Sequence, residues 1–403
     1  MAHASGIRDF LMDVVLRSRG VVVRSLVARH GLLVLTVSSL AACGDDAPSR
    51  AGASDARTAP RIDASVAIGS PEAGAPLDGP PQAACVDPCF AAGVFTGKPI
   101  SMAVRDGVVY VAVRRSSDAL PDERMPDTII AVAPDKHVTV LAHVAAAPSK
   151  LLVDATSVYW LNRGEHVNNR FRNPAVMKVG RDHGSPEVLA LEPPPDVGIF
   201  DAPFLGDDNV YFAAFVERIA SIRAVPVAGG ETHTFIESDM LDPSIDVHVV
   251  PRSMAVRGDT IYWIDTFGGL AKMPKAGGPP QFILPPPSVV SGGLSITDQA
   301  FYFIAGRADA VGIADLVTLP LGGGQVTTLV AGVATGGVGQ IWTLIDGNSL
   351  YYGDVSFPED GDSYRVALEG GSPVRVAPSG VFALDETYLY WADSTGRVYR
   401  TAK

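Results

Sequence analysis

The sequence lacks the short motifs by which many enzyme classes are recognised. It contains no His-Glu-x-x-His, no Gly-x-Ser-x-Gly, no lysine-bearing phosphate loop and no dinucleotide-binding glycine fingerprint. These absences argue against zinc peptidases of that type, α/β-hydrolases, P-loop enzymes and dinucleotide-dependent oxidoreductases. The main-body histidines are scattered without metal-ligand spacing, at His137, His143, His166, His183, His233 and His248.

Helical periodicity and positive charge are also scarce. No strong helical period of apolar residues runs through residues 85–403, which favours an all-β fold. The formal net charge is −12, and the first 42 residues hold five Arg and two Asp, a net +3, which leaves −15 for residues 43–403. An acidic body of this kind repels phosphate backbones, so we expect no nucleic-acid partner.

Cysteine is rare, with only three residues in the chain: Cys43, Cys85 and Cys89. Cys85 and Cys89 bracket three residues at the start of the main body. In an exported protein this pair favours a disulfide that staples a single turn. The alternative, a metal pair, lacks a second Cys or His pair nearby to complete a zinc site.

The N-terminal region has the pattern of an export signal. Arg24 and Arg29 precede an apolar run, residues 31–40, which is too short to span a bilayer. The run ends in Leu40-Ala41-Ala42-Cys43, which resembles the lipobox of bacterial lipoproteins. The resemblance implies a signal peptide over residues 1–42 and a lipid on Cys43 that anchors the protein in the membrane. The expected location is the bacterial cell envelope, on the outer membrane or cell surface, facing the periplasm or the exterior. The alternative is an ordinary signal peptide with a chance cysteine at the cleavage site.

Residues 43–84 form a segment rich in Ala, Pro and Gly, with few large apolar residues. Such a composition buries too little surface to offset the entropy of ordering, so we expect a disordered tether. A flexible chain of this length reaches roughly 35 Å, which would hold a folded domain clear of a membrane.

Residues 85–403 repeat one strand pattern seven times. Each copy has a turn with Asp, one or two apolar residues, a tyrosine and then usually another aromatic residue. The tyrosines are Tyr110, Tyr159, Tyr211, Tyr262, Tyr302, Tyr351 and Tyr390. The intervals are 49, 52, 51, 40, 49 and 39 residues. Repeats of 40–50 residues built from short strands are typical of a β-propeller. We predict one propeller of seven four-stranded blades; six is the alternative if the first, divergent unit is not a blade.

The fourth unit shows how one blade divides into strands. We expect strands over residues 252–256, 261–264, 270–274 and 281–284, with the pair Gly277-Gly278 supplying the positive φ of the last hairpin. The last unit lacks its fourth strand, and residues 90–96 form a free strand-like segment before the first. Because an open ring would leave exposed strand edges, we predict that residues 90–96 pair with the last strand and close the ring.

The best-formed copies resemble the YWTD repeats of low-density-lipoprotein-receptor (class B) propellers. The resemblance rests on Tyr262-Trp263-Ile264-Asp265 and Tyr390-Trp391-Ala392-Asp393, with degenerate copies at the other tyrosines. It implies that the aromatic side chains fill the gaps between blades and that the Asp ties strands by hydrogen bonds. It implies no ligand. The receptor propellers have six blades, so a count of seven departs from them.

The loops between the second and third strands vary in length, which is usual where a rigid scaffold carries a binding site. The first two such loops are rich in Arg, with His and Phe alongside, and could hold an anionic partner. These residues are Arg114, Arg115, Arg124, Arg163, His166, Arg170, Phe171 and Arg172. The alternative is a set of solvated charges offset by nearby acids. The aspartates of the repeated turns are interpreted as turn-forming residues, because Asp bonds its own backbone in turns.

A second candidate site lies in the sixth loop, where Glu359, Asp360 and Asp362 surround a glycine. Acidic oxygens of this kind bind Ca²⁺, although the loop lacks the full spacing of a known calcium loop. We predict no other cofactor. The sequence predicts a monomeric, non-catalytic module that binds an envelope protein or glycan. The alternatives are a divalent-metal-dependent hydrolase or lyase with its site at the central channel, and a purely structural component.

Overall fold

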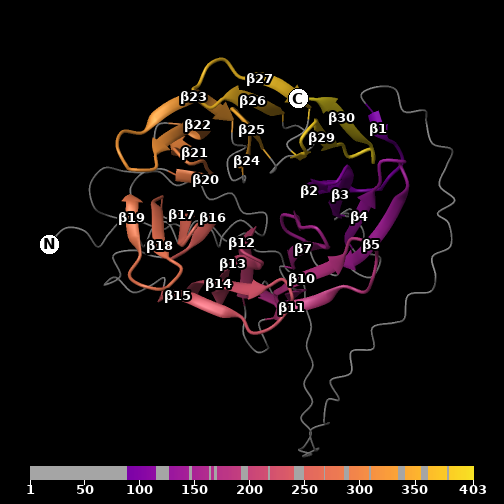
Figure 1. Cartoon of the computed structure of the whole chain (residues 1–403), viewed down its shortest axis with the longest axis horizontal. Helices are drawn as coiled ribbons and strands as arrows, with labels where there is room; N and C mark the ends of the chain where they lie inside the picture. The colour runs from indigo at the N-terminus through magenta and orange to yellow at the C-terminus, as the bar shows by residue number, and fades with distance from the viewer. Residues whose placement is uncertain are drawn as a thin grey trace, which may run out of the picture. The chain divides into compact units, whose positions relative to one another are not determined.

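The structure is a computed structural model that describes residues 89–114, 127–144, 148–162, 165–167, 170–191, 198–216, 218–239, 249–266, 268–285, 290–307, 310–334, 341–354, 362–378 and 381–403. The chain divides into units Met1–Ala75 and Pro76–Lys403, and all described residues belong to the second. They form seven four-stranded antiparallel sheets arranged as a β-propeller (Figure 1). The predicted all-β, seven-bladed fold is confirmed. The described chain contains no helix long and apolar enough to cross a membrane.

The first four blades follow the chain in order, and their strands are named A to D within each blade. Blade 1 contains β2 (Lys98–Arg105), β3 (Val108–Arg114), β4 (Asp127–Val132) and β5 (Val138–Val144). Blade 2 contains β6 (Leu152–Val153), β7 (Ser157–Asn162), β10 (Ala175–Gly180) and β11 (Glu187–Leu191). Blade 3 contains β12 (Gly198–Gly206), β13 (Asn209–Val216), β14 (Ile219–Pro226) and β15 (His233–Asp239). Blade 4 contains β16 (Pro251–Arg257), β17 (Thr260–Asp265), β18 (Leu270–Pro274) and β19 (Gln281–Leu284).

The remaining three blades complete the ring. Blade 5 contains β20 (Val290–Ile296), β21 (Ala300–Arg307), β22 (Ala310–Pro320) and β23 (Thr327–Ala334). Blade 6 contains β24 (Ile341–Asp346), β25 (Ser349–Asp354), β26 (Ser363–Ala367) and β27 (Val374–Ala377). Blade 7 contains β28 (Phe382–Leu384), β29 (Tyr388–Ala392), β30 (Val398–Ala402) and β1 (Cys89–Ala91). The four strands predicted for blade 4 match the observed ones to within one residue at each end.

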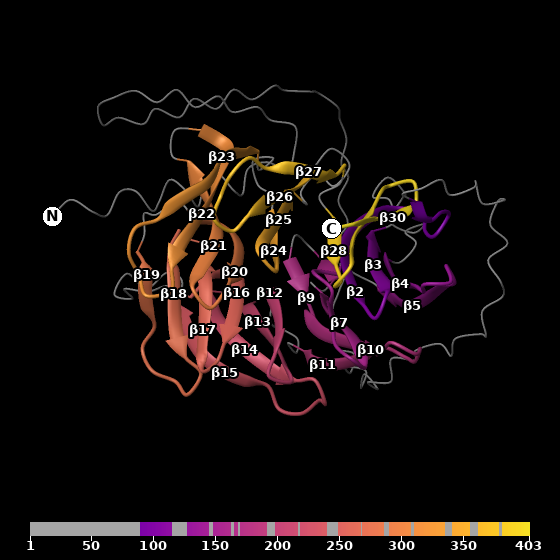
Figure 2. The same ribbon diagram turned by 45° about the horizontal axis from the view of Figure 1, so that its top comes forward.

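The ring closes where the two ends of the propeller pair in one sheet. Strand β1 pairs antiparallel with β30, and Val94 N donates to Gly396 O at 2.9 Å. The guanidinium of Arg400 lies 4.8 Å from the Phe90 ring and 4.7 Å from the Tyr388 ring, so it sits against an aromatic group from each side of the closure. Figure 2 shows β30 at this meeting point. The predicted closure is confirmed.

Each of the seven junctions between blades contains its own cluster of buried apolar side chains. Successive residues of a strand point to opposite faces of the sheet, and this explains the repeated Tyr-aromatic pair. In β7, Tyr159 packs towards blade 3 and Trp160 towards blade 1. In β29, Tyr390 packs towards blade 1 and Trp391 towards blade 6. One dipeptide therefore fills two junctions.

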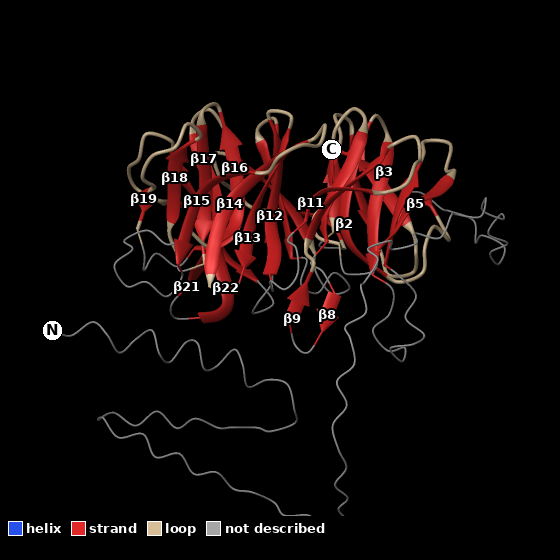
Figure 3. Ribbon diagram, turned by 90° about the horizontal axis from the view of Figure 1, so that it is seen from below, coloured by secondary structure: helices blue, strands red, loops and turns tan. Residues whose placement is uncertain are grey.

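The two ends of the propeller differ in their connections. One end, here the turn face, carries the short A–B and C–D turns. The other, the loop face, carries the B–C loops and the D–A connections. The loop face also carries β8 (Glu165–Val167) and β9 (Arg170–Arg172), a hairpin that projects beyond the blades (Figure 3). Because the chain alternates between the two faces, each A strand begins at the loop face and ends at the turn face.

Candidate functional site

The predicted arginine cluster belongs to the loop face. Arg114 is the exposed last residue of β3 and lies opposite Lys98 in the sheet. His166 lies in β8, and Arg170, Phe171 and Arg172 make up β9. Arg115, Arg124 and Arg163 lie outside the described residues. The structure therefore places five of the eight predicted residues at this end.

The β8–β9 hairpin belongs to none of the seven blades. Its register pairs Glu165 with Arg172, His166 with Phe171 and Val167 with Arg170. Strand β9 lies beside β12, the innermost strand of blade 3. The hairpin therefore stands at the junction of blades 2 and 3.

Of the predicted calcium ligands, only Asp362 lies within the described residues. Its Oδ1 pairs with Arg375 Nη2 at 2.7 Å, and Tyr364 Oη donates to its Oδ2 at 3.4 Å. The Tyr364 ring stacks on Tyr352 at 5.5 Å between ring centres, and burial raises the pKa of Tyr352 to about 12. Glu359 and Asp360 lie outside the described residues, as do Cys43 and Cys85, while Cys89 begins β1. Where the structure describes side chains, no three His, Cys, Asp or Glu residues gather as a metal-binding group.

The turn aspartates are held by hydrogen bonds of their own turns. Asp154 Oδ1 accepts from the backbone N–H of Thr156 at 2.7 Å and of Ser157 at 2.8 Å, while its Oδ2 accepts from Tyr159 Oη at 2.6 Å. Burial alone would raise the pKa of Asp154, but these hydrogen bonds outweigh it and the pKa is lowered. Asp385 repeats the arrangement, with Tyr390 Oη at 2.9 Å. The structural interpretation of these two residues is confirmed.

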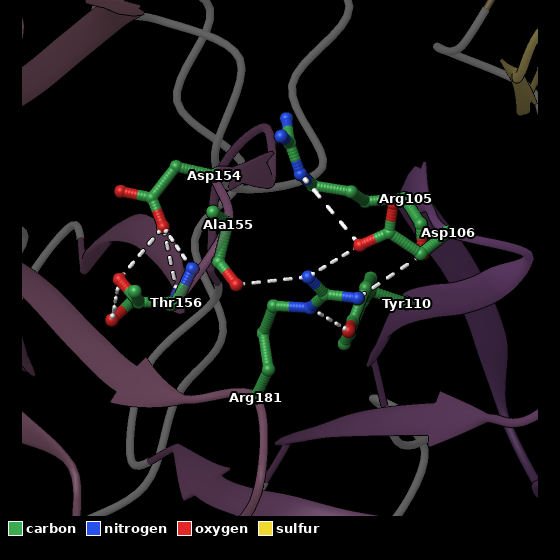
Figure 4. A network of polar contacts seen from close by, with 8 residues as sticks. Arg105, Asp106, Tyr110, Asp154, Ala155, Thr156 and Arg181 are labelled. Carbon is green, nitrogen blue, oxygen red and sulfur yellow. Dashed lines mark hydrogen bonds and ion pairs between the residues drawn. The ribbon is translucent and has the colours of Figure 1, made fainter.

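The first residue after strand C also serves the scaffold on the turn face. In blade 2 it is Arg181, which crosses to blade 1: its Nε donates to Tyr110 Oη at 2.7 Å and its Nη1 to Asp106 Oδ2 at 2.8 Å (Figure 4). The same position holds Lys275, which pairs with Asp207 at 2.6 Å, and Lys403, which pairs with Asp346. In blades 3, 5 and 6 it is apolar: Val227, Leu321 and Leu368 pack into the junction clusters. Much of the charge on this face is thus engaged between blades.

The A strands carry a second repeated contact, nearer the axis. Leu151 N donates to Ser101 Oγ of blade 1 at 2.8 Å, and Leu294 N donates to Ser253 Oγ of blade 4 at 3.0 Å. Both serines stand two residues before the residue that pairs with the repeated tyrosine, Tyr110 in blade 1 and Tyr262 in blade 4. In blade 2 this position is Lys150, because Leu152 pairs with Tyr159.

Lys150 was missed from the sequence, although the signal is visible once the units are aligned on their tyrosines. Blades 1 and 4 share the run Ser-Met-Ala-Val-Arg, at residues 101–105 and 253–257, whereas blade 2 has Lys150-Leu151-Leu152. The spacing from turn Asp to Tyr differs between the units, so the correspondence needs the observed register. Burial lowers the pKa of Lys150 from 10.5 to about 8.

No family model matches the chain, and no curated protein matches its sequence. Among solved structures, a mutant puromycin hydrolase complexed with PGG is similar over 74% of this chain and 50% of its own, at 12% identity and a TM-score of 0.54. The computationally designed Ika8 protein is similar over 78% of this chain and 99% of its own, at 13% identity and a TM-score of 0.44. The hydrolase shows a shared fold alone, and this chain spans half of its length. The YWTD resemblance and the lipoprotein assignment stay predictions.

Proposed function

We propose that this protein is a lipid-anchored propeller of the bacterial cell envelope whose loop face binds a protein or glycan partner without catalysis. The β8–β9 hairpin is the observation that carries the proposal. Seven complete blades close the ring without it, so the fold does not require these two strands. Additions to a rigid scaffold that the scaffold does not need are where binding residues usually lie.

The contrast with the turn face supports the choice of end. On the turn face, Asp106, Asp154, Asp207 and Asp385 are engaged in hydrogen bonds or ion pairs that hold turns and blades together. On the loop face, Arg170 and Arg172 occupy an added hairpin, and Arg114 ends β3 near Lys98. Cations at this end of an acidic protein favour a partner that carries negative charge.

The test is capture of envelope components by the purified protein, with charge-reversed variants. We expect Arg170→Glu/Arg172→Glu to lose the captured partner while its thermal unfolding stays unchanged. Lys136→Glu is the matched control, because Lys136 is an exposed cation in the C–D turn of blade 1, at the opposite end. Equal capture by wild type and the double variant would show that the hairpin is not the binding element.

A further inference from the structure

At its inner strands, the junction of blades 2 and 3 differs from the junctions of blades 1–2 and 4–5. In blades 1 and 4 the inner serine accepts the N–H of the next blade's A strand, from Leu151 and Leu294. The residue of blade 3 that corresponds to Leu151 is Pro203, because Phe204 pairs with Tyr211. Proline has no N–H to donate, so a serine at position 150 would have no such partner there. The chain places Lys150 at this position.

The backbone on both sides of Lys150 is fixed. Ser149 N donates to Leu161 O at 2.9 Å, and Ser149 Oγ accepts from Leu161 N at 3.1 Å. Leu151 is held by Ser101. Leu151 packs into the cluster shared with blade 1, and Leu152 into the cluster shared with blade 3. Lys150 precedes β6 and takes the position of Ser101, whose Oγ contacts the next blade, so we infer that Lys150 is directed towards blade 3.

The facing strand β12 is irregular at this level. Its register shifts between Asp201 and Phe204, as the A strands of blades 1, 4 and 5 also shift near this level. In β12 the shift includes Ala202 with a φ of 49°, a left-handed conformation uncommon for a residue with a side chain. Bulges and strained backbone are frequent beside functional sites. Asp201 Oδ1 accepts the N–H of Ala202 at 2.9 Å. Strand β9 of the added hairpin lies beside the same strand.

From this arrangement we propose that Lys150 is the anion-binding group of a site at the inner edge of the blade 2–3 junction, and that its ligand is a carboxylate. Three features coincide here: a lysine at the position where blades 1 and 4 carry the serine, a proline in the facing strand where those junctions have the donating leucine, and an added hairpin. The inference rests on the proposed function and specifies that the negatively charged group of the loop-face partner is a carboxylate.

A carboxylate fits better than a phosphate for reasons of charge. One ammonium group matches one negative charge, whereas a phosphate dianion brings a second negative charge to a body that carries −15 outside its leader. The partly buried position strengthens the interaction relative to a fully solvated lysine. Lys150 already has an interaction partner within the chain, so the ligand adds to that contact or replaces it.

The experiment observes Lys150 directly. Lysines are dimethylated with ¹³C-formaldehyde, a modification that keeps their charge, and the Lys150 resonance is assigned by its loss in Lys150→Arg. The protein is titrated with N-acetylglutamate and with glucuronate, which present the carboxylate on an amino acid or on a sugar. N-acetylglutamine and glucose are the neutral controls. We expect a saturable shift of the Lys150 resonance with one or both carboxylates and none with the neutral probes. No shift with either carboxylate, or an equal shift of all lysine resonances, would overturn the inference.

A designed variant provides the second test. Lys150→Ser/Pro203→Leu rebuilds the serine-to-N–H contact found at the junctions of blades 1–2 and 4–5. We therefore expect the variant to fold and to lose at least about tenfold in carboxylate affinity by calorimetry, an effect of about 1.4 kcal/mol. Unchanged affinity in this variant refutes the role of Lys150 and leaves the hairpin proposal intact. If wild type captures no envelope partner while the Lys150 resonance still shifts, the proposed function fails and the carboxylate site remains.

Discussion

The two junctions on either side of blade 2 are built from equivalent strands, but they differ in the groups that join the blades. At the junction with blade 1, Arg181 binds Tyr110 and Asp106 on the turn face, and Ser101 accepts the N–H of Leu151 nearer the axis. At the junction with blade 3, the position of Arg181 is taken by Val227 and that of Ser101 by Lys150. The first junction uses polar groups to join blades.

The second junction joins its blades with apolar groups and keeps its cation near the axis. Val227 packs against a cluster that includes Tyr159 and Phe212. Lys178 Nζ donates to Val227 O at 3.2 Å across the junction, and it also pairs with Glu187 of its own blade at 3.2 Å. Burial of Lys150 disfavours its charged form. A junction that places such a cation beside an added hairpin is a better candidate for a binding site than the junction of blades 1 and 2, where Arg181 and Ser101 join the blades.

The largest expected effect is on the core of the first junction. Trp160 is 1% exposed and packs against Tyr110, Ile129 and Leu151. We expect Trp160→Ala to lower the free energy of unfolding by about 3–5 kcal/mol, because it leaves a cavity between blades 1 and 2. Urea unfolding followed by tyrosine fluorescence measures the loss.

Trp160→Phe separates packing from polarity at the same position. The indole N–H of Trp160 has no hydrogen-bond partner in the described structure, so phenylalanine removes an unsatisfied donor while keeping an aromatic ring. We expect a clearly smaller loss than with alanine. A similar loss in both variants would mean that the indole N–H makes a stabilising contact after all.

The second prediction concerns Lys150 and has the opposite sign. Its folded-state pKa of about 8 lies below the unfolded value of 10.5, so the unfolded chain binds the proton more tightly between these two values. The stability of the wild type therefore rises as pH increases through this window. At neutral pH we expect Lys150→Met to be more stable than wild type by on the order of 1–3 kcal/mol.

The pH dependence distinguishes this effect from a gain in packing. The advantage of Lys150→Met should shrink as the pH rises from about 8 and vanish only well above the unfolded value of 10.5, where the wild-type amine is neutral in both states. Lys136→Met, at an exposed turn, should show no such trend. Unfolding curves across this range measure both variants. A constant difference at every pH would contradict the burial of a charged amine.

Much of the fold could be predicted from the sequence because the same strand pattern recurs seven times. The repeated tyrosine, followed by a second aromatic residue in six of the seven blades, marks strand B. The glycine pair at residues 277–278, with φ of 94° and 123°, marks the hairpin of blade 4. The closing strand follows from counting: a last unit without strand D and a free segment at residues 90–96 complete each other. These signals come from local sequence or from the number of strands in each unit, and they do not require knowledge of tertiary side-chain contacts.

The candidate site depends on contacts between side chains that are far apart in the sequence, and such contacts are harder to predict from the sequence than the strands are. The arginines in the sequence indicated a site in the loops of blades 1 and 2. Strand β9 lies in the loop of blade 2, but only the structure shows that it packs beside β12 of blade 3. Lys150 passed unnoticed because its role depends on register. Only the pairing of Leu152 with Tyr159 and of Phe204 with Tyr211 shows that Lys150 replaces a serine and that Pro203 removes the matching N–H.

The smallest expected effect tests whether the two turn-face solutions are interchangeable. Arg181→Val copies into the first junction the residue that the second junction uses. The Arg181 side chain is only 14% exposed, whereas Asp106 is 68% exposed, so the ion pair itself is worth little. The loss should come instead from the hydrogen bonds to Tyr110 and to Ala155 O, the latter at 2.9 Å. We expect about 1–2 kcal/mol from thermal unfolding.

Asp106→Asn provides the comparison that assigns this loss. It removes the charge of the exposed partner but leaves Arg181 bonded to Tyr110 and Ala155. We expect it to cost less than about 0.5 kcal/mol. A loss as large as that of Arg181→Val would show that the ion pair with Asp106 stabilises the junction of blades 1 and 2. The ion pair of Lys275 with Asp207 would then be expected to stabilise the junction of blades 3 and 4 in the same way. A smaller loss would show that the junctions of this propeller are set by buried packing and hydrogen bonds, with the ion pairs contributing little.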